Sequence, residues 1–166
     1  NQKNNQERNG IRLDMETGRS QILQALQHNP DFAWSKLHDH PLTNHFYLVD
    51  DVTARVNKRW ESYLASIKTP EERKLAEDWF AKSDGLGVEH VRAATTAVKE
   101  NRWDDAESVL IKKINPSYRI GDGALKTLSE HADKRIEGDA AAVAAGLSRN
   151  STTVTVVLVG GLALSV

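Results

Sequence analysis

Three arginines near the N-terminus, Arg8, Arg12 and Arg19, could bind an anion. In a helix that turns about 100° per residue, they project onto or beside an apolar stripe. The stripe consists of Ile11, Met15, Ile22 and Leu26. Charged side chains are seldom buried without a partner, and guanidinium groups bind carboxylates through paired hydrogen bonds. The pattern therefore predicts a carboxylate-binding site. Alternatively, the arginines extend into solvent or pair with Glu16 or another carboxylate of the chain.

A second polar group surrounds Pro116 and consists of Asn115, Ser117, Tyr118 and Arg119. We expect Pro116 to open the last long helix, because proline is preorganised for the first helical turn. Free backbone N–H groups at such a start also favour anions. The alternative is that Asn115 and Ser117 only cap the helix. Since the first and last helices of an up-down bundle are neighbours, the two polar groups are predicted to form one ligand site.

Several histidines gather between the first two predicted helices. They are His28, His38, His40 and His45, with Asp39 among them. Imidazole and carboxylate groups suit a divalent transition metal, but the spacing matches no established metal motif. Histidines near helix ends also bind carbonyl groups or stack on rings such as Trp34. We therefore assign no metal and no cofactor here, and keep a histidine-based metal-binding bundle as an alternative.

The composition argues against several classes of protein. The chain has no cysteine, which excludes disulfides, thiol catalysis and cysteine-bound metal centres. Its 22 Lys and Arg balance 23 Asp and Glu, so it lacks the positive field of a nucleic-acid binder. It also lacks a Glu-x-x-His pair, a phosphate-binding glycine loop and a nucleophile elbow. The acidic residues within 71–74 and 104–107 are typical of solvated helix starts. We expect no enzymatic activity.

Apolar residues recur at intervals of three and four along most of the chain, which predicts an all-α fold. A first helix is expected to carry Arg8 to Leu26 and to end near residue 28. Further helices are expected over 43–68, from 69 to about 100 with glycines at 85 and 87 that weaken it, over 103–114, and from 115–117 onward. The run from Thr69 to Glu72 predicts a capped helix start. Together these segments predict an up-down-up-down four-helix bundle over residues 1–150.

The last part of the chain, residues 151–166, carries no charge and becomes increasingly apolar. It is shorter than the roughly 20 residues that cross a bilayer, but its composition predicts the start of a transmembrane helix. The alternative is a buried strand, since valine and threonine also suit a sheet. In an up-down bundle, a last helix that enters a membrane brings the first helix to the same membrane.

Segments 18–30, 60–64, 69–73 and 115–117 occur in an order and spacing that resemble a known family. It is the periplasmic ligand-binding region of methyl-accepting chemotaxis proteins, in the four-helix-bundle type of the aspartate and citrate receptors. The resemblance implies that arginines of the first helix and polar residues beside a proline of the fourth hold the ligand, often across a dimer interface. By resemblance, Arg12 and Arg19, with Arg8, take the first role, and Asn115 and Ser117 take the second.

The resemblance implies a sensor domain of a chemotaxis receptor, in the periplasm and anchored in the inner membrane by flanking helices. Its expected ligand is a small organic acid such as malate or citrate, because the arginine spacing differs from that of the aspartate receptor. We expect a homodimer or higher homo-oligomer, no nucleic-acid partner, and a helix shift as the signal. Alternatives are the sensor domain of a histidine kinase and a purely structural helical domain.

Overall fold

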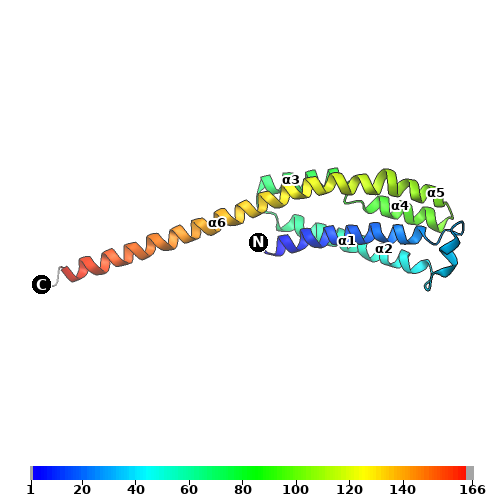
Figure 1. Cartoon of the computed structure of the whole chain (residues 1–166). Coiled ribbons are helices and arrows are strands. Elements are labelled where there is room, and N and C mark those ends of the chain that lie inside the picture. The colour runs from blue at the N-terminus through cyan, green and yellow to red at the C-terminus, as the bar shows by residue number, and fades with distance from the viewer. Residues whose placement is uncertain (1, 164–166) are drawn as a thin grey trace. The chain divides into compact units, whose positions relative to one another are not determined.

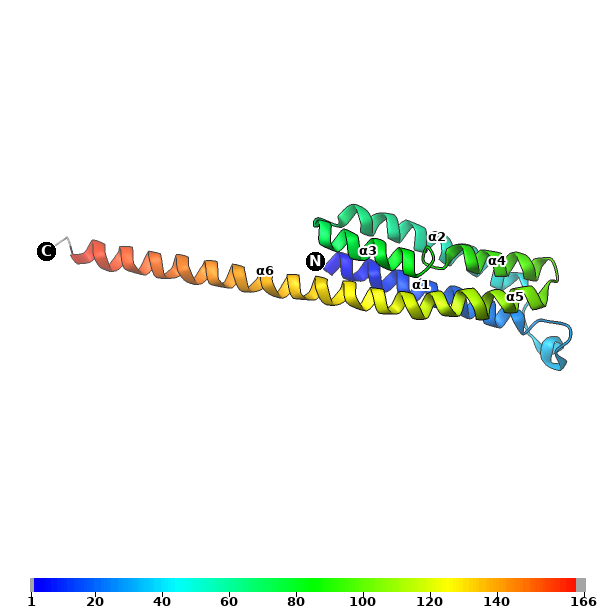
Figure 2. The same cartoon turned by 90° about the horizontal axis from the view of Figure 1, so that it is seen from above.

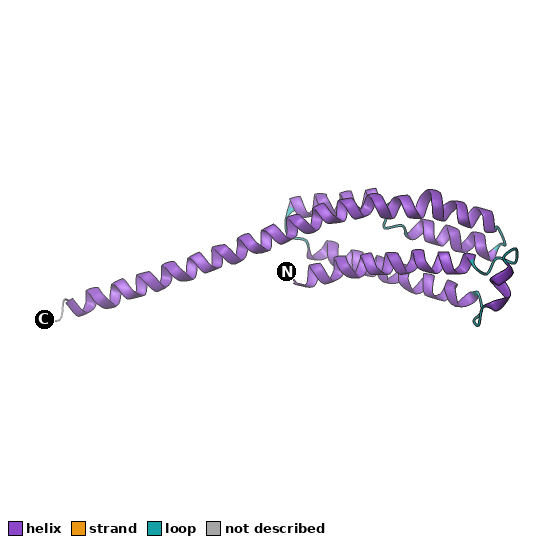
Figure 3. Cartoon of the chain, in the orientation of Figure 1, coloured by secondary structure: helices purple, strands orange, loops and turns teal. Residues whose placement is uncertain are grey.

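The computed structural model describes the main chain of residues 2–163 and the side chains of residues 2–149. This part of the chain is helical and contains no strand, which confirms the all-α prediction (Figure 3). Its helices are α1 (Gln2–Leu26), α2 (Thr43–Ser66), α3 (Pro70–Lys82), α4 (Val88–Lys99), α5 (Trp103–Val109) and α6 (Asn115–Ala163), with a 3-10 helix η1 (Ala33–Leu37) and a π-helix η2 (Leu110–Ile114). The chain separates between Ser129 and Glu130 into two compact units, and the features below lie in the first unit.

Helices α1 and α2 run antiparallel and make the most extensive contacts of any helix pair (Figures 1 and 2). Asp14 of α1 accepts hydrogen bonds from Nε and Nη2 of Arg55 at 3.0 and 2.8 Å. Arg59 of α2 bonds Asp14 and Glu7, both at 3.2 Å. These charged groups close one edge of the α1–α2 pair, while the apolar stripe predicted on α1 faces the core.

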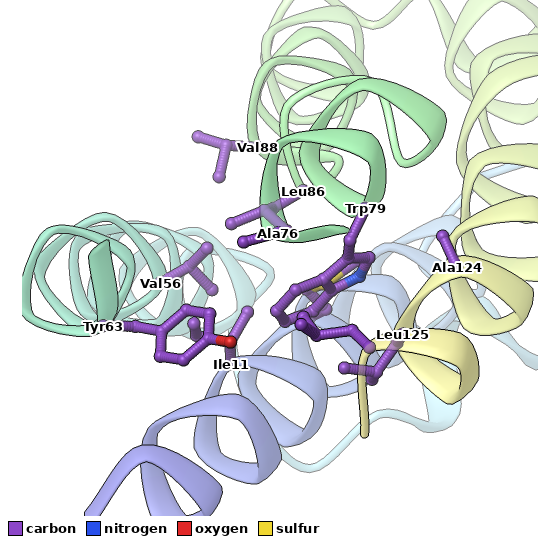
Figure 4. Close-up of a cluster of buried hydrophobic side chains, with 11 residues drawn as sticks. Ile11, Val56, Tyr63, Ala76, Trp79, Leu86, Val88, Ala124 and Leu125 are labelled. Carbon is purple, nitrogen blue, oxygen red and sulfur yellow. The ribbon is translucent and has the colours of Figure 1, made fainter. Parts of the chain in front are cut away.

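The core is built from α1, α2, α3 and the first part of α6. Ile11, Val56 and Trp79 pack together there with Ala124 and Leu125 (Figure 4). A second cluster toward the other end of the unit consists of Ile22, Val49, Val91, Ala94, Leu110 and Ile114. Burying a large apolar side chain contributes about 1.5 to 3 kcal/mol. These clusters therefore fix α1 against α6, which positions the polar residues discussed below.

The predicted start of α3 is confirmed, because Thr69 Oγ1 accepts a hydrogen bond from the Glu72 backbone N–H at 3.3 Å. The interpretation of Glu72 as a solvated residue is wrong. Its side chain is fully buried, and its carboxylate lies 3.9 Å from Nη1 of Arg8. The hydroxyl of Tyr63 donates to the same carboxylate oxygen at 3.2 Å. Arg8 and Glu72 thus form a buried ion pair inside the helix cluster.

The segment predicted as one helix from 69 to about 100 is interrupted between α3 and α4. Asp84, Gly85, Leu86 and Gly87 all have left-handed backbone conformations, with φ between 50° and 68°. This succession makes a tight left-handed turn that reorients the chain. The two glycines adopt such φ values without strain, whereas the buried Leu86 relies on its core contacts.

The predicted start of the last long helix coincides with the start of α6 at Asn115, with Pro116 as its second residue, but this start is not a free helix end. Helical dihedral angles continue from Val109 through Leu110 to Asn115, so the helical path is unbroken between α5 and α6. Pro116 cannot donate to the carbonyl four residues earlier, and its ring clashes there in a regular helix. The π-turn η2 just before it, in which the Asn115 N–H bonds the Leu110 carbonyl, widens the helix and accommodates the proline.

No helix among the described residues is long and apolar enough to cross a membrane. The predicted transmembrane start, 151–166, falls largely outside what the structure describes. Its main chain is helical as far as Ala163, its side chains are not described, and residues 164–166 are not described at all.

Candidate functional site

A groove of about 440 Å³ lies between α1 and α6. Its lining residues are Asn9, Gly10, Arg12, Leu13, Glu16, Tyr118 and Asp122. The size suits a small organic molecule, and the lining mixes one cation, two carboxylates and a phenol. The predicted residues Arg12 and Tyr118 therefore line one depression, although they are 106 positions apart in the sequence.

Two predicted arginines connect α1 to α6. Arg12 donates from Nε to the carboxylate of Asp122 at 3.2 Å. Arg19 donates to Glu16 at 2.8 and 3.2 Å, and from Nη1 to the side-chain carbonyl of Asn115 at 3.2 Å. The hydrogen bond to Glu16 raises the pKa of Arg19, against a smaller opposing effect of burial. Both arginines thus have carboxylate partners within this chain, as the alternative interpretation of the sequence expected.

Tyr118 is the residue of the groove whose polar group is unsatisfied. Its hydroxyl is buried and has no hydrogen-bond partner among the described residues. The pKa of Tyr118 is raised, mainly by burial and to a smaller extent by the negative charge of Glu16. The phenol therefore stays protonated at neutral pH, and its hydroxyl keeps an unused hydrogen-bond donor.

The remaining predicted residues, Arg19 and Asn115 included, do not line this groove. Arg8 is 2% exposed and faces Glu72 in the core. Ser117 is buried, with its hydroxyl 2.6 Å from the Lys113 carbonyl and 2.9 Å from a carboxylate oxygen of Asp84. Arg119 is exposed on the outer side of α6. Because the helix is continuous here, no free backbone N–H groups gather at Pro116 to bind an anion.

The second candidate site is a group of histidines at the tip where α1 connects to α2. We call His28, His40 and His45 the histidine triad. Nε2 of His45 lies 3.1 Å from Nε2 of His28 and 2.9 Å from Nε2 of His40. One ligand atom of each residue lies within 4.8 Å of the other two. His38 stays outside the triad and stacks on His28 with ring centroids 3.9 Å apart.

The outer nitrogens of two triad members are held by neighbouring side chains. Nδ1 of His45 lies 2.7 Å from Oε1 of Gln21, and Nδ1 of His40 lies 2.8 Å from the carboxylate of Asp39. Burial, and then the charge of the other histidines, lowers the pKa of His45 to about 4. Burial also lowers the pKa of His28. The surroundings of His28 and His45 therefore favour the neutral form of these two imidazoles.

Sequence reasoning missed residues that complete both sites. Asp122 lies four positions after Tyr118, and Gln21 lies seven before His28. Residues four apart share one face of a helix, so this spacing could have identified Asp122. No spacing could have identified Gln21, because it meets His45 only through the packing of α1 and α2. Spacing alone could not bring the triad together, because His28 and His40 meet only through the fold of the connection between α1 and α2.

Comparisons of the chain with protein-family models, with curated proteins and with solved structures found no match.

Proposed function

We propose that this chain is the sensor domain of a chemotaxis receptor: a four-helix bundle in the periplasm, anchored in the inner membrane, that binds a small di- or tricarboxylate such as malate or citrate. The ligand lies in the groove between α1 and α6. The observation that carries this proposal is the buried hydroxyl of Tyr118, which has no hydrogen-bond partner among the described residues, on a residue that lines the groove together with Arg12. A buried polar group without a partner is costly, and a ligand oxygen would satisfy it.

The charges of the groove suggest how such a ligand binds. Arg12 and Asp122 are both more than half exposed, so their ion pair contributes little and is readily exchanged. A ligand carboxylate takes the place of Asp122 on Arg12, and Tyr118 donates its hydrogen bond to the same ligand. Arg19, already bonded to Asn115 of α6, receives a second carboxylate in place of Glu16.

A ligand held in this way touches two helices and favours one relative position of α1 and α6. Binding energy biases a receptor only through such a difference between two states. Helix shifts of about 1 to 2 Å are an established signalling movement. Helix α6 extends from Asn115 to Ala163 and includes most of the uncharged segment whose composition predicts the start of a membrane span.

Exposed apolar residues support a homodimer that uses the same side of the domain. Leu13 lines the groove, and Leu23 and Ile111 line a second depression between α1 and the η2–α6 region. All three are exposed in the single chain. A second copy would cover them and would bring the carboxylate site to the subunit interface.

Calorimetric titration with malate and citrate tests this proposal. Charged hydrogen bonds contribute about 1.5 to 3 kcal/mol each, so Arg12→Ala and Arg19→Ala should each weaken binding about tenfold or more. Tyr118→Phe should weaken it several-fold, whereas Asp122→Asn should strengthen it by removing the competing carboxylate. Arg92→Ala is the matched control, because Arg92 forms the same kind of i,i+3 pair, with Glu89 on α4.

Unchanged affinity for the acids in both Arg12→Ala and Arg19→Ala would show that they do not bind in the groove. Absence of binding of both acids to the unaltered protein would remove this ligand class.

A further inference from the structure

The three rings of the histidine triad are arranged around one point. Their centroids are 5.2 Å apart for His28 and His40, 5.1 Å for His28 and His45, and 4.9 Å for His40 and His45. The corresponding interplanar angles are 74°, 69° and 75°. The rings therefore form a nearly equilateral set, each inclined to the others by a similar angle.

This arrangement resembles that of imidazoles bound to one tetrahedral ion. Ligand nitrogens at about 2.0 to 2.1 Å from zinc lie roughly 3.3 to 3.4 Å from one another, with ring centroids roughly 5.2 Å apart. In the triad, Nε2 of His45 lies 2.9 Å from Nε2 of His40 and 3.1 Å from Nε2 of His28. Small outward movements of the side chains would make room for an ion at the centre.

Hydrogen bonding fixes which nitrogen of His40 and of His45 faces that centre. The carboxylate of Asp39 can only accept, so it holds the proton of His40 on Nδ1. The carbonyl oxygen of Gln21 does the same for His45. Both Nε2 atoms then carry lone pairs directed at one another across 2.9 Å. A cation between them would turn this repulsion into coordination, and metal-bound histidines commonly have such partners on the other nitrogen.

We propose that the histidine triad is a Zn²⁺ site in which Nε2 atoms of His28, His40 and His45 are the ligands and a water molecule takes the fourth position. Zinc suits neutral imidazoles in tetrahedral geometry, and a site with three protein ligands keeps one position open. Gln21 and Asp39 orient the rings. The site goes beyond the proposed carboxylate sensing and shares no residue with the groove between α1 and α6.

The position of the ligands gives the ion a structural consequence. His28 follows the end of α1, His40 lies in the connection, and His45 lies in the first turn of α2. One ion would therefore tie both helices to the segment that joins them. Metal binding adds to folding stability when the unfolded chain lacks the site.

The test is calorimetric titration of the whole chain with Zn²⁺, after chelator treatment and with no histidine tag. We expect one ion per chain, a higher unfolding temperature with zinc, and the visible absorption of tetrahedral Co²⁺ when cobalt is used instead. His40→Gln and His45→Gln should each lower zinc affinity by roughly two orders of magnitude. Asp39→Asn should lower it about tenfold.

His131→Gln is the control, because His131 lies in the second unit, outside the triad. Circular dichroism of the metal-free variants shows whether they fold, and the exposed Asp39 and half-buried His40 keep the test independent of the buried His45. Failure to bind zinc stoichiometrically would overturn the proposal, and so would equal zinc affinity in His40→Gln and the unaltered chain. Malate or citrate binding measured without zinc is unaffected by either outcome.

Discussion

Arg8, Arg12 and Arg19 share one helix but lie in three different electrostatic surroundings. Arg8 is enclosed in the core beside Glu72, and its guanidinium carbon lies 5.7 Å from the centroid of the Tyr63 ring. Arg12 is largely exposed beside Asp122, and Arg19 lies between these extremes. The same residue type is therefore enclosed in the core at one position and at least partly exposed to solvent at the other two.

We predict a large difference in stability between two alanine variants of α1. Arg8→Ala removes the guanidinium partner of the buried Glu72 carboxylate, and breaking a buried ion pair in this way costs about 3 to 5 kcal/mol. Arg12→Ala breaks an exposed pair and should cost less than about 1 kcal/mol. Urea unfolding followed by circular dichroism measures both free energies. Equal losses in the two variants would contradict the buried ion pair.

At the level of elements, the left-handed turn between α3 and α4 is held in place by α6. A Cβ atom at Gly121 of α6 would lie 2.8 Å from Cβ of Ser83, so the two backbones approach closely. Ser83 Oγ also accepts a hydrogen bond from the Leu86 N–H at 3.1 Å, and Asp84 bonds Ser117. The turn is therefore part of the packing that positions Tyr118 above the groove.

Two glycine substitutions should change stability in opposite directions. Gly87 has φ of 68°, where a side chain costs about 1 to 2 kcal/mol, so Gly87→Ala should destabilise the protein. Gly123 lies inside α6 with no atom near the place of an added Cβ, so Gly123→Ala should stabilise it by about 0.5 to 1 kcal/mol. Thermal unfolding of both variants measures this. Stabilisation by Gly87→Ala would show that the left-handed turn is not required.

The sequence predicted the helices better than their interruptions. Apolar spacing located the end of α1 and both ends of α2 to within a few residues, and Thr69 identified the start of α3, because these signals are local. The sequence predicted only a weakened helix at Gly85 and Gly87, where the structure has a left-handed turn. Two glycines inside a helical pattern indicate that the helix is less stable there, but they do not indicate which backbone conformation replaces it. The π-turn was missed because Pro116 alone is equally typical of a helix start.

The candidate site was predicted in part for the same reason. Residues on a shared helix face, such as Arg12 and Glu16, follow from periodicity. The pairing of Arg12 with Asp122, and of Arg8 with Glu72, depends on how separate helices pack. The three histidines of the triad come together because of the path of the connection between α1 and α2. This connection is irregular, so no periodic pattern in the sequence predicts its path.

For the molecule as a whole, we predict that ligand binding changes the association state without any catalytic turnover. Malate or citrate should shift the sedimentation distribution toward the dimer, because the groove and the exposed apolar residues lie on the same helices. Leu23→Glu should prevent this shift by placing a charge in the interface. Leu37→Glu, a change at an exposed leucine of the α1–α2 connection, should not. Identical mass distributions with and without saturating acid would contradict this prediction.

The π-turn before Pro116 also affects how the chain tolerates changes in length. Ala106, Leu110, Ile114 and Tyr118 are spaced four apart and all contribute to packing. In a regular helix such spacing drifts by about 40° at each step, or about 120° from Ala106 to Tyr118. The wide turn takes up part of this drift. Insertion or deletion of one residue within η2 would therefore rotate α5 relative to the groove residues of α6, so the length of this short segment is more constrained than its sequence.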